Sequence, residues 1–283
     1  MKPYYQRNGI TIYCGNCLDV MPLLDPPFDA IIADMPYGTT QNEWDSVLQL
    51  SEVWLQYKRL IKSGGGIVLT ATQPFTSELV MSNKEWFKWE DVWRKSHATG
   101  HLNCKVMPLR QHENILVFGE GRITYNPQIE QKPMIDVRPS RKSAAKTSNY
   151  GAYHNNPETT IPLDMSYPRS VLEINSPNHG EKGLHPNQKP FALMAYLIRT
   201  YTNPEEIVLD NTMGSGTTLA AAQDEGRQAV GIELSEEYCK IAVERLRQPS
   251  LFTLPSNNGM YATAQPSLPA QGSLFNDIDS GGA

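Results

Sequence analysis

Short apolar runs alternate with longer amphipathic stretches along most of the chain. Phe28–Ala33 and Glu206–Asp210 are short and mostly apolar, which is typical of strands buried on both faces of a sheet. Val47–Lys62 and the stretch from Ser235 to about Arg247 repeat apolar residues at spacings of three and four, which predicts helices with one buried face. Buried strands that alternate with such helices predict an open α/β sheet.

The same pattern predicts the remaining elements. Strands are expected at 10–13, after the glycines at 64–66, at 86–93, at 113–118 and at 227–234. Helices are expected at 17–24, 75–81, 191–202 and 219–225. The side chains expected to face inward are Leu48, Val53, Trp54, Tyr57 and Leu60 in helix 47–62 and Tyr238, Ile241, Ala242 and Leu246 in the last helix.

A carboxylate, a proline and an aromatic ring follow the first of these buried strands, in Asp34-Met35-Pro36-Tyr37. Open α/β sheets hold their ligands at the carboxyl ends of strands. An exocyclic amine on a nucleobase is a poor nucleophile, because its lone pair is delocalised into the ring. We expect Asp34 and a backbone carbonyl held by Pro36 to accept both amine hydrogens and free that lone pair. Tyr37 would offer a flat face to a base taken out of the duplex.

A second buried strand ends in Asp210 and leads into a turn with glycines at 214 and 216. Glycine lets the backbone approach a ligand, and the free amides of the next helix face that ligand. The turn is not a Walker phosphate loop, because no Gly-Lys-Ser/Thr closes it, and it lacks the third glycine of the dinucleotide fingerprint. Glu233 ends the next strand at roughly the spacing of 20 residues from which an acid binds ribose hydroxyls.

The motifs resemble those of the beta class of DNA amino-methyltransferases. That family has Asp/Asn/Ser-Pro-Pro-Tyr/Phe where this chain has Asp34–Tyr37, so Met35 replaces a proline. It has Asp-Pro-Phe-x-Gly-Ser-Gly-Thr-Thr where this chain has Asp210–Thr218, with Asn211-Thr212 in place of Pro-Phe. His-Pro-x-Gln-Lys-Pro, here 185–190, also matches. The order of the motifs is the circular order of the beta class, and it argues against the protein glutamine methyltransferases, which place the cofactor loop first.

The resemblance implies a Rossmann-like, circularly permuted fold with an inserted target-recognition region, and S-adenosyl-L-methionine as the cofactor. It implies catalytic roles for Asp34, Met35, Pro36 and Tyr37. The residues that it places at the cofactor are Asn16, Cys17, Asp34, Lys189, Asp210, Met213, Gly214, Ser215, Gly216, Thr217, Glu233 and Leu234. No metal is needed for this chemistry. Cys14 and Cys17 have the spacing of a redox pair or of half a zinc site, but no second ligand pair follows.

The function expected from this resemblance is site-specific transfer of a methyl group to the N6 amine of adenine in DNA. Asp leads the motif, whereas Ser more often leads it in cytosine-N4 enzymes, so cytosine-N4 methylation is the runner-up. A different class of answer is a DNA-binding relative that has lost catalysis, given its departures from the family pattern. The resemblance extends to enzymes of restriction-modification systems, phages and prophages, and so implies a bacterial cell or a phage-infected bacterium.

Charge and composition predict the domain organisation. The net charge is −5, yet residues 93–150 carry ten basic and four acidic residues, a balance of +6 that suits a surface tracking DNA phosphates. A solvated insertion without a partner is the alternative. We expect a catalytic domain formed by 1–92 and 171–247, a target-recognition insertion at 93–170, and a disordered tail at 248–283. Residues 41–44 are expected to form a mobile loop beside the active site.

The tail repeats the pattern Gln-x-Ser-Leu-Phe, at Gln248–Phe252 and at Gln271–Phe275. Both resemble the peptide by which bacterial replication proteins dock on the sliding clamp. Alternatively, such short patterns recur by chance in a tail rich in Ser, Pro and Gln, or Leu251 and Phe252 pack against the domain. No apolar run reaches membrane-spanning length and no signal peptide is recognised, so a cytoplasmic protein is expected. The sequence leaves homodimerisation open.

Overall fold

The structure is a computed structural model. It describes residues 1–25, 27–37, 48–132, 161–176 and 188–247. These all belong to one unit, Met1–Pro249, while a second unit, Ser250–Ala283, lies outside the described residues together with both predicted clamp motifs and the expected loop at 41–44.

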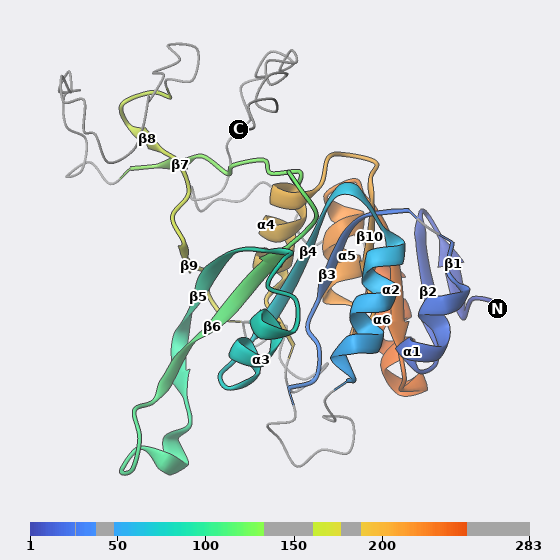
Figure 1. The fold of residues 1–283 in the computed structure, drawn as a ribbon, viewed down its shortest axis with the longest axis horizontal. Helices are drawn as coiled ribbons and strands as arrows, with labels where there is room; N and C mark the ends of the chain where they lie inside the picture. Colours follow the sequence, from blue (N-terminus) through green and yellow to red (C-terminus); the bar gives the residue numbers. More distant parts are fainter. Residues whose placement is uncertain (26, 38–47, 133–160, 177–187, 248–283) are drawn as a thin grey trace, which may run out of the picture. The chain divides into compact units, whose positions relative to one another are not determined.

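The described strands form one large mixed sheet, in the order β1-β2-β11-β10-β3-β4-β6-β5-β9 (Figure 1). In that order they are β1 (Tyr5–Arg7), β2 (Ile10–Cys14), β11 (Gln228–Glu233), β10 (Ile207–Asp210), β3 (Phe28–Ala33), β4 (Ile61–Ala71), β6 (Arg110–Phe118), β5 (Phe87–Thr99) and β9 (Val171–Glu173). The five strands from β2 to β4 are parallel to one another, and β6 runs antiparallel to both β4 and β5. A separate ribbon pairs β7 (Glu130–Gln131) with β8 (Met165–Ser166).

Helices cover both faces of this sheet, as its apolar strands require (Figure 1). The helices are α1 (Cys17–Val20), α2 (Leu50–Leu60), α3 (Phe75–Ser82), α4 (Phe191–Tyr201), α5 (Thr217–Asp224) and α6 (Glu236–Arg247), with short 3-10 turns η1 (Met21–Leu23) and η2 (His101–Asn103). Apolar residues of α4, α5 and α6 share one core with one sheet face, and those of α1, α2 and α3 share a second core with the other face. The protein is therefore a three-layer α/β structure.

Most predicted elements are confirmed, with shifts at their ends. The expected helix at 17–24 is α1 followed by η1, and the strand expected at 86–93 continues to Thr99 in β5. The predicted boundary between residues 92 and 93 therefore falls inside a strand, although the division into domains stays a prediction. In α2, the inward residues are as expected, except that Leu48 lies before the helix and is only partly buried.

The expected inner face of the last helix is partly wrong. Ala242 and Leu246 are buried, but Cys239 and Val243 share their face, while Tyr238 and Ile241 lie at its margin. Ala242 packs closely against the turn that precedes α5. A Cβ added at Gly216 would lie 2.8 Å from the Ala242 Cβ. Ala242 is common to the expected and the observed faces, so the helix is turned about this position toward Cys239 and Val243.

The sheet order reverses between β10 and β3. From β3 the chain continues to β4 on one side, and from β10 it continues to β11 on the other. Ligands of open α/β sheets bind outside the carboxyl ends of the strands at such a reversal. Asp210 ends β10 and Asp34 directly follows β3, so the two predicted motifs lie side by side at this point.

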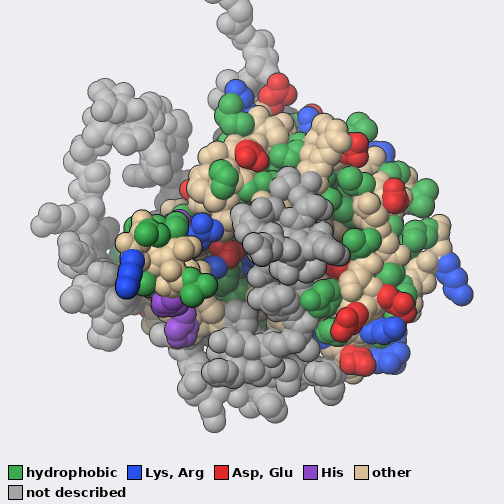
Figure 2. Space-filling view, turned by 90° about the horizontal axis from the view of Figure 1, so that it is seen from below, with side chains coloured by type: hydrophobic (Ala, Val, Ile, Leu, Met, Phe, Trp, Pro, Cys, Tyr) green, Lys and Arg blue, Asp and Glu red, His purple; other side chains and the backbone are tan. Residues whose placement is uncertain are grey.

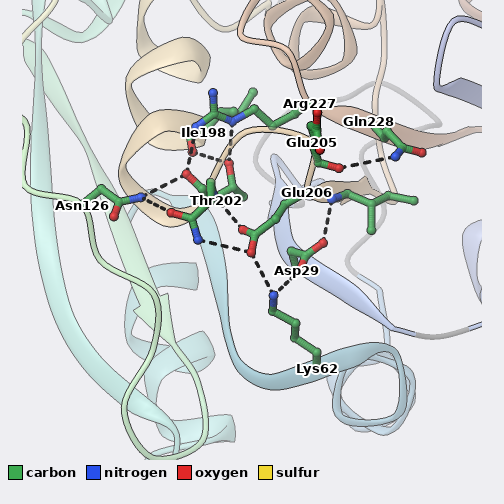
Figure 3. A network of polar contacts seen from close by, with 11 residues as sticks. Asp29, Lys62, Asn126, Ile198, Thr202, Glu205, Glu206, Arg227 and Gln228 are labelled. Carbon is green, nitrogen blue, oxygen red and sulfur yellow. Dashed lines mark hydrogen bonds and ion pairs between the residues drawn. The ribbon is translucent and has the colours of Figure 1, made fainter. Parts of the chain in front are cut away.

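A polar network ties the same strands together at their opposite, amino ends (Figure 3). Asp29 accepts a hydrogen bond from the backbone N–H of Ile207 at 2.7 Å and forms an ion pair with Lys62. Lys62 Nζ also contacts Glu206 Oε1 at 3.0 Å. Asp29 thereby links the starts of β3, β10 and β4.

We predict that Asp29→Ala lowers the free energy of unfolding by about 1–3 kcal/mol, because the Ile207 N–H and one side of Lys62 lose their acceptor. Urea unfolding measures this. Lys240→Ala is the control, since the Lys240–Glu236 pair is 61% exposed on both sides and should change the stability little. Equal losses in the two variants would contradict the role of Asp29.

Candidate active site

The Asp34 loop and the glycine turn are joined by a direct contact. The Thr212 hydroxyl donates to the backbone carbonyl of Asp34 at 3.1 Å, and the Thr212 N–H donates to Asp210 Oδ1 at 3.1 Å. The strands behind these loops pair in parallel, with Val208 opposite Ala30. Residues far apart in the sequence thus form one site at the sheet reversal.

Three donors converge on the Asp34 carboxylate. Oδ1 accepts from the Tyr37 hydroxyl at 2.5 Å and from the Thr70 hydroxyl near the end of β4, and Oδ2 accepts from Lys189 Nζ at 2.5 Å. The Tyr37 ring lies 5.6 Å from the Phe75 ring, centroid to centroid, and Lys189 Nζ is 5.6 Å from the Tyr37 centroid. Tyr37 therefore places its hydroxyl on the carboxylate and its ring between Phe75 and Lys189.

Lys189 also contacts a second carboxylate, that of Glu113. Asp34, Lys189, Glu113 and Lys95 thus form a chain of four alternating charges. Lys189 Nζ lies 3.3 Å from Glu113 Oε2, and Glu113 Oε1 is ion-paired with Lys95. Burial alone would raise the pKa of Glu113, but Lys189 and Lys95 outweigh it and the pKa is lowered. Burial would lower the pKa of Lys189, but Asp34 and Glu113 outweigh it and the pKa is raised. Both groups are therefore charged, as buried ions are when they are paired.

The glycine turn is organised by the predicted ribose ligand, Glu233. Its Oε2 accepts from the Gly214 N–H at 3.0 Å and its Oε1 accepts from the Ser235 N–H at 2.8 Å. Burial raises the pKa of Glu233, against these hydrogen bonds, which lower it. Gly214 and Gly216 have φ angles of 52° and 75°, a left-handed conformation that favours glycine. Each carboxylate oxygen keeps a second acceptor position for a ligand hydroxyl.

Asp210 lies deeper than the other acids of the site. Burial raises its pKa to about 7, against the hydrogen bonds from Thr218 and Thr212, which lower it, while Asp34 and Glu233 raise it further. Asp210 thus carries less than a full negative charge near neutral pH. It supports the turn rather than adding a full third charge to the site.

The turn also contains a buried donor that fits a ligand with an acceptor group. The Ser215 hydroxyl donates to Gln188 Oε1 at 3.3 Å, while Gln188 Nε2 is buried and has no hydrogen-bond partner among the described residues. Buried donors are rarely left unpaired in proteins. An anionic or carbonyl oxygen, such as the carboxylate of S-adenosylmethionine, would satisfy it, so the residues present fit this cofactor.

Asn16 and Cys17 lie at the corner that the sequence places against the cofactor. Asn16 is the N-cap of α1, and its Oδ1 accepts from the Leu18 N–H at 2.9 Å, which leaves its amide hydrogens for another partner. Cys17 is buried, and burial raises the pKa of its thiol. Cys14 and Cys17 form no disulfide.

The other predicted cofactor residues are placed unevenly. Met213 is buried in the core, Thr217 accepts a hydrogen bond from Arg245 at 2.8 Å, and Leu234 is 65% exposed just beyond Glu233. Their contact with a cofactor stays a prediction.

Met35 and Asn211, which replace prolines of the family pattern, both lie against the Tyr57 hydroxyl. Tyr57 is fully buried, and its hydroxyl donates to Asn211 Oδ1 at 2.6 Å and lies 3.7 Å from Met35 Sδ. Met35 and Asn211 are themselves buried, at 2% and 1% exposure. The residues that replace the two prolines therefore form a packed polar contact between the two loops.

Sequence reasoning missed Thr70, Glu113 and Tyr57 as parts of the site. Thr70 is a polar residue close to the end of an apolar strand that neighbours β3, and Glu113 is an acid within β6 directly before its apolar run. A polar residue beside a buried apolar run marks both positions in the sequence. Tyr57 was expected only as a core residue of α2.

Comparison with known proteins identifies the class. A family model described as DNA methylase matches residues 28–244, and the chain belongs to this family. The expectation of a beta-class DNA amino-methyltransferase with a Rossmann-like fold is confirmed.

Individual relatives agree with this assignment. Type II methyltransferase M.ScaI of Streptomyces caespitosus is 26% identical over 263 residues, which cover 87% of this chain and 84% of that protein. DNA adenine methyltransferase YhdJ of Escherichia coli (strain K12) is 27% identical over 238 residues, covering 77% and 76%. The solved complex of M1.HpyAVI with SAM has a TM-score of 0.61 at 26% identity and covers 84% of this chain and 100% of that one. PvuII DNA methyltransferase, described as cytosine-N4-specific, has a TM-score of 0.60 at 16% identity and shows the fold alone.

None of the helices in the described part of the chain combines the length and the apolar composition that a bilayer span requires.

We predict that the Tyr57–Asn211 hydrogen bond couples α2 to the glycine turn. Tyr57→Phe and Asn211→Ala should each destabilise by about 1–3 kcal/mol, because each leaves a buried partner unpaired. The double variant should lose less than the two single losses combined, with a coupling of about 1 kcal/mol in a double-mutant cycle of urea unfolding. Strictly additive losses would show that this hydrogen bond does not couple α2 to the turn.

Proposed function

We propose that this protein transfers a methyl group from S-adenosylmethionine to the N6 amine of adenine in double-stranded DNA, after the target base has left the base stack. The observation that carries this proposal is the Asp34 carboxylate, held by Lys189, Thr70 and Tyr37 beside the glycine turn at the sheet reversal.

The acceptor capacity of Asp34 matches an amine. A carboxylate has about four acceptor positions, and among the described residues three donors contact Asp34, with Lys189 alone on Oδ2. Oδ2 therefore has room for an N–H of the substrate. With a backbone carbonyl beside Pro36 as the second acceptor, both amine hydrogens are held and the nitrogen lone pair is directed away from the ring.

Lys189 and Glu113 position this carboxylate. The Lys189 ammonium neutralises charge beside Asp34, and Glu113 fixes the ammonium from its other side. Neither residue is proposed to exchange a proton with the substrate. Because the reacting groups must be aligned closely, small displacements of Asp34 cost rate.

S-adenosylmethionine supplies an electrophilic methyl group. The protein's own contribution is to bind and orient the amine and to exclude water from it, with no covalent intermediate on a side chain. Tyr37 and Phe75 offer aromatic surface beside Asp34 for the base.

Adenine is favoured over cytosine by two observations. Asp leads the catalytic motif, and a relative of 27% identity is described as a DNA adenine methyltransferase. Cytosine-N4 methylation is the second candidate. Loss of catalysis is disfavoured by the packing of Met35 and Asn211 around Tyr57, because the departures from the family pattern keep both loops joined.

We further propose that duplex DNA contacts the basic segment 93–150. Six of its ten cations are described, and Arg94, Lys105 and Arg110 are exposed among them, whereas Lys95 is held by Glu113. The sliding-clamp motifs and homodimerisation stay predictions.

Transfer of labelled methyl to unmethylated bacterial DNA, followed by nucleoside mass spectrometry, tests the function. We predict N6-methyladenine from the wild type and a loss of about 10²-fold or more in Asp34→Ala, which removes the side-chain acceptor of the amine hydrogen. Glu244→Gln, an exposed acid on α6, is the matched control and should retain full activity.

Other outcomes of this assay lead to other conclusions. N4-methylcytosine would establish the second candidate. No product from a folded protein that binds S-adenosylmethionine would identify an inactive relative, and wild-type activity in Asp34→Ala would refute the role of Asp34.

A further inference from the structure

A two-stranded arm leaves the sheet at the edge that carries the active site. β4 ends at Ala71, opposite Asn114 of β6, but β5 and β6 continue past this point as a ribbon. We call residues 94–112 the arm. Arg94 pairs with His112 and Thr99 with Arg110, and the connection contains η2. Figure 1 shows the arm extending away from the rest of the sheet.

The base of the arm touches the catalytic centre. Glu113, the residue directly after it, lies 3.3 Å from the Lys189 ammonium that binds Asp34. Lys95 of the arm is paired with the same Glu113. A molecule bound along the arm therefore lies close to Asp34.

The charged side chains of the arm are all basic. Residues 94–112 contain four Lys or Arg and three His and no Asp or Glu. Arg94 is paired with Glu173 and Lys95 with Glu113, from outside the arm, while Lys105 and Arg110 are exposed. Such a surface is complementary to a polyanion.

The tip of the arm is apolar and exposed. Leu102 is fully exposed and Val106 is 82% exposed, with Met107 and Leu109 beside them at 46% and 38%. Figure 2, which looks onto this edge, shows hydrophobic, basic and histidine side chains gathered on one lobe, and the described histidines all belong to the arm. Exposed apolar side chains at the end of a basic ribbon are unusual unless they meet a partner.

We propose that the arm enters a groove of duplex DNA and that its apolar tip, led by Leu102 and Val106, wedges into the base stack beside the target base. This inference rests on the proposed function and adds to it the device that opens the duplex. A two-stranded ribbon fits the major groove, and six residues past Trp93 extend by roughly 20 Å, which exceeds the groove depth of about 8.5 Å. Apolar wedges unstack base steps in other DNA-binding proteins.

A second copy of this chain is the competing occupant. Two identical arms with the same sign of charge repel each other, whereas DNA phosphates attract both, so charge favours DNA.

Two variants separate the roles of the cations and the tip. Lys105→Ala/Arg110→Ala removes exposed cations, and Leu102→Ser/Val106→Ser removes the wedge. The controls are Lys84→Ala and Leu55→Ser, which change exposed residues before β5 and on α2. The probe is a labelled 30-base-pair duplex of mixed sequence, bound over a range of salt concentrations and followed by fluorescence anisotropy.

We expect the cation variant to weaken binding and to reduce the slope of log K against log salt by about 2, since each phosphate contact contributes about 0.9. The tip variant should keep the wild-type slope but methylate duplex DNA about tenfold more slowly. Both variants should bind S-adenosylmethionine like the wild type, and both controls should match it in every assay.

Other outcomes overturn the inference. They are wild-type affinity, slope and methylation rate in both arm variants, or no duplex binding by the wild type. A wild-type dimer in sedimentation velocity that dissociates in the tip variant, with DNA binding unchanged, would assign the arm to a second copy. Duplex binding that depends on the arm, without any methylated product, would refute the proposed function but not the binding role of the arm.

Discussion

The site depends on a buried chain of alternating charges, from Lys95 through Glu113 and Lys189 to Asp34. An unpaired charge at this depth would be costly, so each ion requires its neighbour. The chain joins strands that the sheet order keeps apart, since Asp34 follows β3 and Glu113 lies in β6, with β4 between them. It thereby fixes the catalytic carboxylate against the sheet.

The same chain connects catalysis with the recognition of DNA that we propose. Lys95 belongs to the arm and Glu113 lies at its base, so the arm and Asp34 share one set of contacts. On the other side of Asp34, the Thr212 hydroxyl of the glycine turn donates a hydrogen bond to the backbone carbonyl of Asp34. Asp34 is thus placed between the proposed DNA surface and the proposed cofactor turn, by ion pairs on one side and by a hydrogen bond to its backbone carbonyl on the other.

Local patterns predicted much of this arrangement. Asp34 and Asp210 were found because buried strands and the residues that end them are encoded within a few positions. The contacts of Glu113 and Tyr57 join residues far apart in the chain, which no local period records. The outer part of β5 was missed because a ribbon exposed on both faces lacks apolar alternation. In α6, two stripes that share Ala242 and Leu246 satisfied the helical spacing, and the tertiary packing that buries Cys239 and Val243 is not encoded in that spacing.

Single-turnover methyl transfer by Glu113→Gln, Lys189→Met and the double variant tests the central claim most directly. If the charges act as one unit that positions Asp34, each single variant loses roughly 10²-fold in rate and the double variant loses no more than the worse single one. Circular dichroism and S-adenosylmethionine binding establish that the variants are folded. A double variant that loses the product of the two single factors, or a Glu113→Gln variant with the wild-type rate, would contradict the account.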